Sequence, residues 1–291
     1  GQRLDKFLGK YMGLAPKSFL YKMLRKKNIT LNGRKAAGGE MLSIGDSVKL
    51  FLSDETIAKF SVSEKSRVPE NAGKGGGPAT QKQMRPDILR PDILYEDKHT
   101  IFINKPAGML SQKAAPGDFS LVDWLLSYLL DSGRITPDEL RAFRPSVCNR
   151  LDRNTSGIVA AGKTLPALQA LGLLFRERTL KKYYLCLVKG QVSAEKRISG
   201  WLVKDEKRNR VTVMQEEREG AARIETEYRP VRTGDGVTLL EVHLITGRTH
   251  QIRAHLASEG HPVIGDYKYG DRKTNELFRR EYGLSSQLLH A

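Results

Sequence analysis

The chain has 291 residues, of which 39% are hydrophobic, so one large domain or a large and a small domain can form and wholesale disorder is not expected. Lysine and arginine number 49 against 33 aspartate and glutamate residues, and the formal charge of +16 favours a polyanionic partner, nucleic acid before anionic membrane. The two cysteines, Cys148 and Cys186, support neither a disulfide framework nor a zinc site, and no stretch has the length of a membrane-spanning helix or the pattern of a signal peptide. We therefore expect a cytoplasmic protein without a bound metal.

Residues 1–53 predict a small α/β unit with a basic surface. Apolar residues recur at helical spacing from Leu4 to Met12, and Pro16 suits the start of a second amphipathic helix. A strand at 29–31, the Asn32-Gly33 turn and a closing strand at 48–52 follow. If this surface binds RNA, its cations hold phosphates and give affinity without base choice; the alternative is a solvated basic helix. The candidate RNA-binding residues are Lys17, Arg25, Lys26, Lys27, Arg34 and Lys35.

Residues 54–84 predict a flexible linker, because the glycine-rich segment 73–78 holds helix or strand poorly. Residues 85–89 are then repeated at 90–94, which is too short a repeat for a solenoid. The acidic residues of this region are a weak candidate for magnesium, because prolines interrupt them and no phosphate-binding loop is near. They are Asp87, Asp92, Glu96 and Asp97.

Residues 85–291 predict one larger domain. Strand-like runs such as 101–103 and 237–242 alternate with turns, and helices are expected from Leu121 and over 165–176. The mixture lacks repeated parallel β-α-β units, so we predict an α+β fold on a mainly antiparallel sheet.

The segment 149–157, Asn-Arg-Leu-Asp-Arg-Asn-Thr-Ser-Gly, is the most informative part of this domain. Apolar residues flank it on both sides, so it is expected to be a tight loop between two strands. The loop places Asp152 between Arg150 and Arg153, and positive charge favours the ionised carboxylate that a nucleophile or base requires. The alternative is a structural Arg–Asp pair that fixes a turn.

Two later segments add chemistry-bearing residues. Residues 182–190 form an expected strand that carries Tyr184, although a strand tyrosine alone is more often a core residue. Residues 246–255 predict a helix beginning near Thr249 and ended by Gly260, with His250 and Arg253 on one face.

Together these segments resemble the R-L-D-x-x-T-S-G, K-x-Y-x-x-x-V-x-G and G-R-T-H-Q-I-R-x-H motifs of the RluA-type pseudouridine synthases. One position departs from the pattern: many members have histidine where this chain has Asn149. The order of elements in residues 1–53 resembles the RNA-binding module shared with the small-subunit ribosomal protein S-four. Family members usually continue past residue 291 with another strand, so we expect this chain to belong to a longer protein.

The resemblance implies an RNA pseudouridine synthase that needs no cofactor and flips its target uridine out of the stack. It implies that Asp152 is catalytic, that Tyr184 stacks on the base and that Arg253 pairs with Asp152. The residues expected to bind substrate are Arg150, Arg153, Thr155, Arg248, His250 and Gln251, and the last three could instead orient the loop.

Large-subunit ribosomal RNA is the first expected substrate and transfer RNA the second. We expect a monomer with no membrane contact and no obligate protein partner. Two other functions remain open: a non-catalytic RNA-binding or ribosome-assembly factor, and a metal-assisted nuclease that depends on Asp152.

Overall fold

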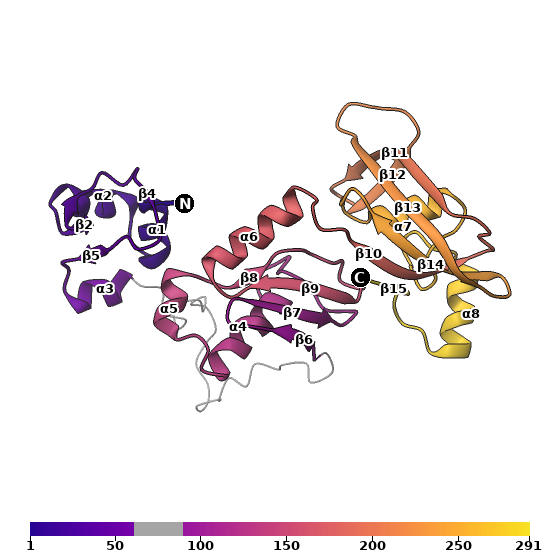
Figure 1. Ribbon diagram of the computed structural model, residues 1–291, viewed down its shortest axis with the longest axis horizontal. Helices are drawn as coiled ribbons and strands as arrows, with labels where there is room; N and C mark the ends of the chain where they lie inside the picture. The colour runs from indigo at the N-terminus through magenta and orange to yellow at the C-terminus, as the bar shows by residue number, and fades with distance from the viewer. Residues whose placement is uncertain (61–89) are drawn as a thin grey trace, which may run out of the picture. The chain divides into compact units, whose positions relative to one another are not determined.

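The computed structural model describes residues 1–60 and 90–291 (Figure 1). These residues fall into two compact units: one contains residues 1–60 and Ile135–Arg144, and the other contains the remaining described residues. All pairings between the described strands are antiparallel, so the predicted α+β class with mainly antiparallel sheets is confirmed.

The first unit packs two helices and short strands around one apolar core. Its helices are α1 (Leu4–Tyr11) and α2 (Lys17–Arg25). Its strands are β1 (Gln2–Arg3), β2 (Ile29–Leu31), β3 (Arg34–Lys35), β4 (Met41–Leu42) and β5 (Val48–Leu50), paired as β1-β4 and β3-β2-β5. The core comprises Leu4, Leu8, Met12, Leu20, Met23, Leu24, Ile29 and Ala36. The helical spacing in the sequence therefore identified most of the core.

The turn between β2 and β3 forms at the predicted Asn32-Gly33 pair. Both residues have left-handed backbone, with φ of 52° and 73°. The Asn32 side chain donates to Asp46 Oδ1 at 2.8 Å and accepts from the Ser47 backbone N–H at 2.8 Å. These bonds tie the hairpin turn to the turn before β5.

The region after β5 differs from the expected linker beginning at residue 54. Helix α3 (Asp54–Phe60) starts there, with the Ser53 carbonyl accepting from the Ile57 N–H at 3.0 Å. The Phe60 ring lies 4.6 Å from the Phe19 ring, so the helix packs on the first unit. The rest of the predicted linker, residues 61–84, and the first copy of the short repeat with Asp87 lie outside the described residues.

The second unit contains a four-stranded sheet in the order β6-β7-β9-β8. These strands are β6 (Asp92–Glu96), β7 (Thr100–Lys105), β8 (Ser146–Val147) and β9 (Gly157–Gly162). The helices near them in sequence are α4 (Leu121–Asp131), α5 (Pro137–Ala142) and α6 (Leu165–Arg176). Helix α5 belongs to the first unit, whereas α6 lies along β9 (Figure 1).

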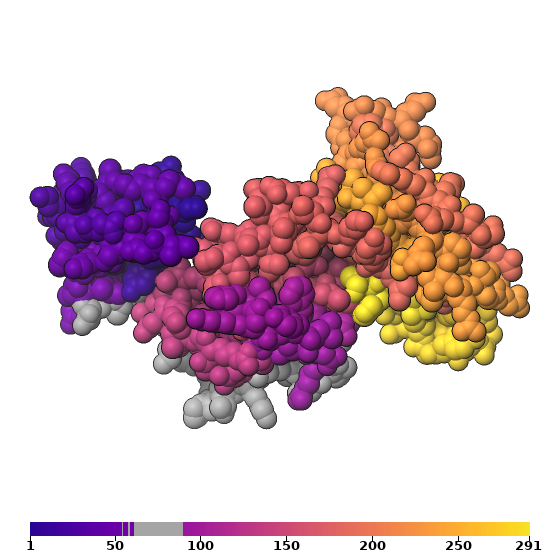
Figure 2. Space-filling view, viewed as in Figure 1, coloured from indigo at the N-terminus to yellow at the C-terminus, as the bar shows by residue number. Residues whose placement is uncertain are grey.

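A six-stranded sheet in the order β12-β11-β13-β14-β10-β15 completes the second unit. Its strands are β10 (Tyr183–Lys189), β11 (Lys196–Asp205), β12 (Arg210–Met214), β13 (Ala222–Thr233), β14 (Val237–Leu244) and β15 (Leu289–His290). Helices α7 (Gln251–Ser258) and α8 (Arg272–Tyr282) follow β14 in the chain, and α7 packs against β12 and β13. The connection between β12 and β13 projects from this unit (Figure 2).

Strand β15 links the two sheets next to the loop that carries Asp152. It pairs with β10, while Ala291 exchanges backbone hydrogen bonds with Ser156 at 2.9 Å and Ile158 at 3.1 Å. Gly157 lies between these residues with φ of 119°, and a Cβ there would overlap the backbone of Ala291. The final glycine of the 149–157 motif therefore permits the contact that anchors the loop.

Candidate active site

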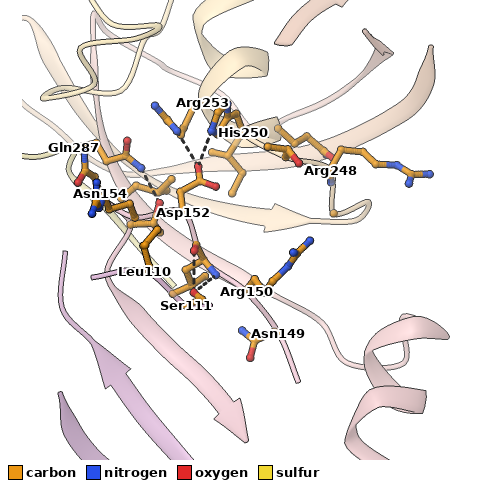
Figure 3. Close-up of a pocket in the computed structure, with 18 of the residues that line it drawn as sticks. Leu110, Ser111, Asn149, Arg150, Asp152, Asn154, Arg248, His250, Arg253 and Gln287 are labelled. Atoms are coloured by element: carbon orange, nitrogen blue, oxygen red, sulfur yellow. Dashed lines mark hydrogen bonds and ion pairs between the residues drawn. The ribbon is translucent and has the colours of Figure 1, made fainter. Parts of the chain in front are cut away.

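A cleft of about 1170 Å³ opens in the second unit around Asp152 (Figure 3). Its walls come from the 149–155 loop, from β10 and from the two loops that precede α7 and α8. It is thus built by segments that are distant in sequence. Its volume exceeds the range of about 300–1,000 Å³ that is typical of small-molecule sites, so it accommodates a ligand larger than a single base.

Asp152 is held at the edge of this cleft by bonds to its loop. The neighbouring Leu151 donates its N–H to Ser111 Oγ at 3.0 Å, and the Ser111 hydroxyl donates to the Leu151 carbonyl at 2.9 Å. The Asp152 side chain keeps 27% of its surface exposed, and its Oδ2 accepts from Arg253 Nη1 at 2.8 Å. The predicted pairing of Asp152 with Arg253 is therefore present in the structure.

Arg253 is itself fixed from behind by Asp266. Its Nε and Nη2 donate to the two Asp266 oxygens at 2.7 and 2.9 Å, and the backbone N–H groups of Lys268 and Tyr269 donate to the same carboxylate. Burial by itself raises the pKa of Asp266, but the bonds and charge of Arg253 outweigh burial and lower it. A bidentate pair of this kind fixes the guanidinium plane, leaving Nη1 for Asp152.

Tyr184 lines the cleft from β10 and is 9% exposed. Burial first, and then the negative charge of Asp152, raise the pKa of Tyr184 to about 12. Its hydroxyl has no hydrogen-bond partner within residues 1–60 and 90–291. At neutral pH the site therefore contains a protonated phenol whose hydroxyl is free to bind a ligand.

His250 has left-handed backbone, with φ of 54°, and stands at the start of α7. Its Nδ1 lies 2.9 Å from the Tyr269 hydroxyl, which also accepts the Val211 N–H at 2.9 Å. Burial is the main reason that the pKa of His250 is lowered, so the neutral ring is favoured. If Tyr269 donates to Nδ1, the proton of the ring is on Nε2, which lies 3.9 Å from Asp152 Oδ2.

Lys105 is a buried lysine near the site that the sequence interpretation missed. Its side chain is fully buried, and Nζ donates to the carbonyls of Pro106, Met109 and Arg153 at 3.0, 2.8 and 3.1 Å. Burial lowers the pKa of Lys105 to about 8, and the charge of Asp152 acts in the opposite direction. The lysine thus ties the turn after β7 to the residue that follows Asp152. In the sequence, 104–108 reads only as a stiff turn.

The structure separates the predicted substrate-binding residues into two groups. The side chains of Arg150, Arg153 and Arg248 are exposed, line the cleft and pair with no carboxylate in the described part of the chain. In Figure 3 the guanidinium of Arg248 points away from Asp152. These three residues are available to an anionic ligand. Arg150 and Arg153 do not pair with Asp152, so Arg253 supplies the ion pair expected from the flanking arginines.

Thr155 and Gln251 already bond protein groups. Thr155 is 2% exposed and its hydroxyl accepts from Gln287 Nε2 at 2.6 Å. Gln251 is also 2% exposed, and its amide bonds Thr246, Thr226 and the backbone of Glu225 and Arg248. Both residues hold loops in place.

Asn149 has a structural role. Its Oδ1 accepts the Ala160 N–H at 2.8 Å, and its Nδ2 donates to the Ile158 carbonyl at 3.1 Å. The amide therefore fastens the start of the loop to β9, using both its donor and its acceptor.

Residues 1–60 and 90–291 contain no group of three or more His, Cys, Asp or Glu side chains arranged to hold a metal ion. Within the same ranges, no helix has the length and apolarity to cross a membrane.

A carboxylate clamped by a buried arginine, beside a free phenol and unpaired arginines, defines an enzyme site for an anionic substrate. The sequence model of the family described as RNA pseudouridylate synthase matches residues 99–258. The ribosomal large subunit pseudouridine synthase C of Vibrio cholerae is 32% identical over 297 residues, covering this whole chain and 84% of that protein. The enzyme of the same name from Escherichia coli K12 is 31% identical over 298 residues, covering the whole chain and 83% of that protein.

Solved structures agree with this assignment. Human RNA pseudouridylate synthase domain containing 1 superposes with a TM-score of 0.54 at 25% identity, over 69% of this chain and 76% of that one. The human domain containing 4 protein shares the fold, with a TM-score of 0.55 at 24% identity over 68% and 81% of the two chains. The chain therefore belongs to the RNA pseudouridylate synthase family, as its resemblance to the RluA-type enzymes predicted.

Proposed function

We propose that this enzyme isomerises specific uridines of large-subunit ribosomal RNA and that Asp152 is its catalytic residue. The observation that carries the proposal is the Asp152 carboxylate, partly open to the cleft and bonded to Arg253 at 2.8 Å. The choice of RNA is supported by the Vibrio cholerae and Escherichia coli relatives, whose names specify the large ribosomal subunit. Cytoplasmic location and a monomeric state remain our expectations, and the latter is tested by the mass of the enzyme in solution.

The reaction breaks the bond between N1 of uracil and C1′ of the ribose and forms a bond between C5 and C1′. N1 takes up a proton and C5 loses one, so atoms balance without a second substrate. Asp152 begins this exchange, either by attack on the flipped nucleotide or by removing a proton from it. Both roles need a carboxylate held in a fixed position, which Arg253 and Asp266 provide.

Tyr184 supports this chemistry from the floor of the cleft. Its ring supplies a stacking surface for the extruded base, and its hydroxyl keeps its proton at neutral pH because its pKa is about 12. Tyr184 therefore acts as a hydrogen-bond donor to the base. Arg150, Arg153 and Arg248 hold the phosphates on either side of the flipped nucleotide, which offsets part of the cost of flipping, about a few kcal/mol.

The first unit acts as an S-four-like RNA-binding module. All six predicted RNA-binding residues are exposed, and none has an acidic partner within the described ranges. They are Lys17, Arg25, Lys26, Lys27, Arg34 and Lys35. Unpaired exposed cations contact phosphates at little desolvation cost, so the module adds affinity without choosing the uridine.

The test is pseudouridine mapping of ribosomal and transfer RNA from cells that lack the enzyme. We expect one or a few sites to disappear from large-subunit ribosomal RNA and to return with the wild-type gene but not with Asp152→Asn. Sites lost only from transfer RNA would redirect the substrate. An unchanged map would favour the non-catalytic RNA-binding factor, and RNA cleavage blocked by a chelator would favour the nuclease.

A further inference from the structure

Lys182 borders the cleft and has no role in the reaction described above. Side-chain exposure alternates along this segment: Lys181 and Tyr183 are exposed, Lys182 is half-buried and Tyr184 is buried. The Lys182 carbonyl accepts the Leu244 N–H at 2.9 Å, so pairing with β14 extends to the residue before the start of β10. Because alternate residues of a strand share a face, Lys182 lies on the same side as Tyr184, and both line the cleft.

The ammonium of Lys182 occupies space left by a glycine. A Cβ at Gly247 would lie 3.0 Å from Lys182 Nζ, and no other atom lies within 4 Å of it. Gly247 is not among the glycines with left-handed backbone, so the turn does not require glycine for conformational reasons. The missing side chain therefore lets the ammonium lie against the backbone that leads to Arg248.

This cation has no counter-ion in the protein. No carboxylate pairs with Lys182 within residues 1–60 and 90–291. Burial and then the positive charge of Arg178 lower the pKa of Lys182. Arg248, which follows Gly247 in the chain, also has no acidic partner in the described ranges. A half-buried cation without a counter-ion is costly to keep unless an anion binds to it, and Arg248 is a second unpaired cation on the lining of the same cleft.

We propose that Lys182 and Arg248 form a subsite for one backbone phosphate of the RNA strand that enters the cleft. The inference rests on the proposed function, because it takes RNA as the ligand. The ammonium supplies a compact charge and the guanidinium supplies paired donors, both suited to phosphate. Since Lys182 is on the same strand face as Tyr184, this phosphate positions the nucleotide whose base reaches Tyr184 and Asp152.

The test compares the wild-type chain with Lys182→Met, with Lys182→Arg and with the matched control Lys181→Met. The control removes the same charge from the neighbouring residue, which is exposed on the other face of the strand. Binding of a short fluorescent oligouridylate is measured between about 50 and 200 mM salt. For Lys182→Met we expect about tenfold weaker binding at the lower salt and a salt slope shallower by about 0.7, as for the loss of one phosphate contact. Lys182→Arg should retain the slope, and Lys181→Met should bind within about twofold of wild type.

Gly247→Ala provides an independent geometric test. Its methyl group would lie 3.0 Å from Lys182 Nζ and shift the ammonium slightly, so it should weaken binding modestly in the wild-type background and have no effect in the Lys182→Met background. Thermal unfolding separates binding from structure: Lys182→Met should keep or raise Tm, because it removes an unpaired, half-buried charge. A structural lysine would lower Tm instead.

Wild-type affinity and salt slope in Lys182→Met would overturn the subsite, whatever its activity. A wild-type chain that makes no pseudouridine but shows the Lys182 effects would refute the proposed function and leave the phosphate site standing. Unchanged binding in Lys182→Met, together with normal pseudouridine formation by the wild type, would refute the phosphate site and leave the proposed function standing.

Discussion

Replacing Asp266 by asparagine keeps the size of the side chain and removes its charge. In the wild type this carboxylate is fully buried and accepts two guanidinium N–H groups of Arg253 and two backbone N–H groups. An amide nitrogen cannot accept, so at least one of these donors loses its partner. Breaking a buried ion pair from one side costs about 3–5 kcal/mol, and we expect the lower value because Asp152 still pairs with Arg253. For a unit of this size, about 3 kcal/mol lowers Tm by about 6–12 °C.

The assay pairs thermal unfolding with turnover. Because Arg253 loses its fixed orientation, we expect kcat to fall by about 10²-fold, as for a misplacement of about 1 Å at a reacting group. The matched control is Glu241→Gln, which breaks the exposed Arg229–Glu241 pair at the same distance of 2.7 Å. That surface pair is worth about 0–1 kcal/mol, so Tm should change little. Equal changes in Tm for the two variants, or wild-type kcat in Asp266→Asn, would refute the conclusion that Asp266 fixes the orientation of Arg253.

The pH dependence of this difference has a definite sign. The pKa of Asp266 is lowered in the folded chain, so its contribution to stability is present above its ordinary pKa and is lost as the pH falls through the lowered value. The gap in Tm between wild type and Asp266→Asn should therefore be full at neutral pH and shrink below about pH 4.

Three further changes test other parts of the site. Tyr184→Phe keeps the stacking ring and removes the hydroxyl, so kcat should fall by about 10²-fold with little change in KM. Because the pKa of this hydroxyl is about 12, the wild-type pH–rate profile should show no limb from Tyr184 below about pH 10. Unchanged kcat in the variant would remove the hydroxyl from the mechanism. The pKa of Lys105 is about 8 in the folded chain against an ordinary 10.5, so the wild-type free energy of unfolding should rise between these pH values. Denaturant unfolding at each pH should show this rise in the wild type and not in Lys105→Met. Parallel plots of unfolding free energy against pH for the two proteins would contradict the buried ammonium. Thr155→Val leaves the Gln287 amide without its acceptor and should cost about 1–3 kcal/mol of stability while substrate KM stays unchanged, whereas a raised KM would return Thr155 to the substrate-binding group.

Local patterns were sufficient for some elements of the fold, and the Asn32-Gly33 turn follows from backbone preferences alone. Tyr184 and Arg253 were selected because their segments resemble motifs of the RluA-type enzymes. The motif resemblance predicted the partner of Asp152 as Arg253, whereas the charges next to Asp152 in the sequence did not. Charges adjacent in sequence suggested Arg150 and Arg153, but adjacent loop residues diverge in space and the partner, Arg253, is 101 positions away.

Burial was the property that sequence reasoning could not supply. Lys105 follows an alternating apolar strand, and lysine is almost never fully buried, so nothing local indicates three carbonyl acceptors around it. Gln251 is a second example: its position in a motif did not indicate that its amide bonds four groups inside the protein. Helix α3 was missed because the glycine-rich segment at 73–78 dominated the interpretation of the region that begins at residue 54.

The most direct test of the account is tritium release from RNA that carries 5-tritiated uridine, because forming the C5–C1′ bond frees the hydrogen on C5. Purified wild type should release tritium from large-subunit ribosomal RNA, leave the RNA intact and do so in the presence of a chelator. Asp152→Asn should bind the same RNA and release none. Release by Asp152→Asn at the wild-type rate would contradict the central claim that the carboxylate held by Arg253 performs the isomerisation.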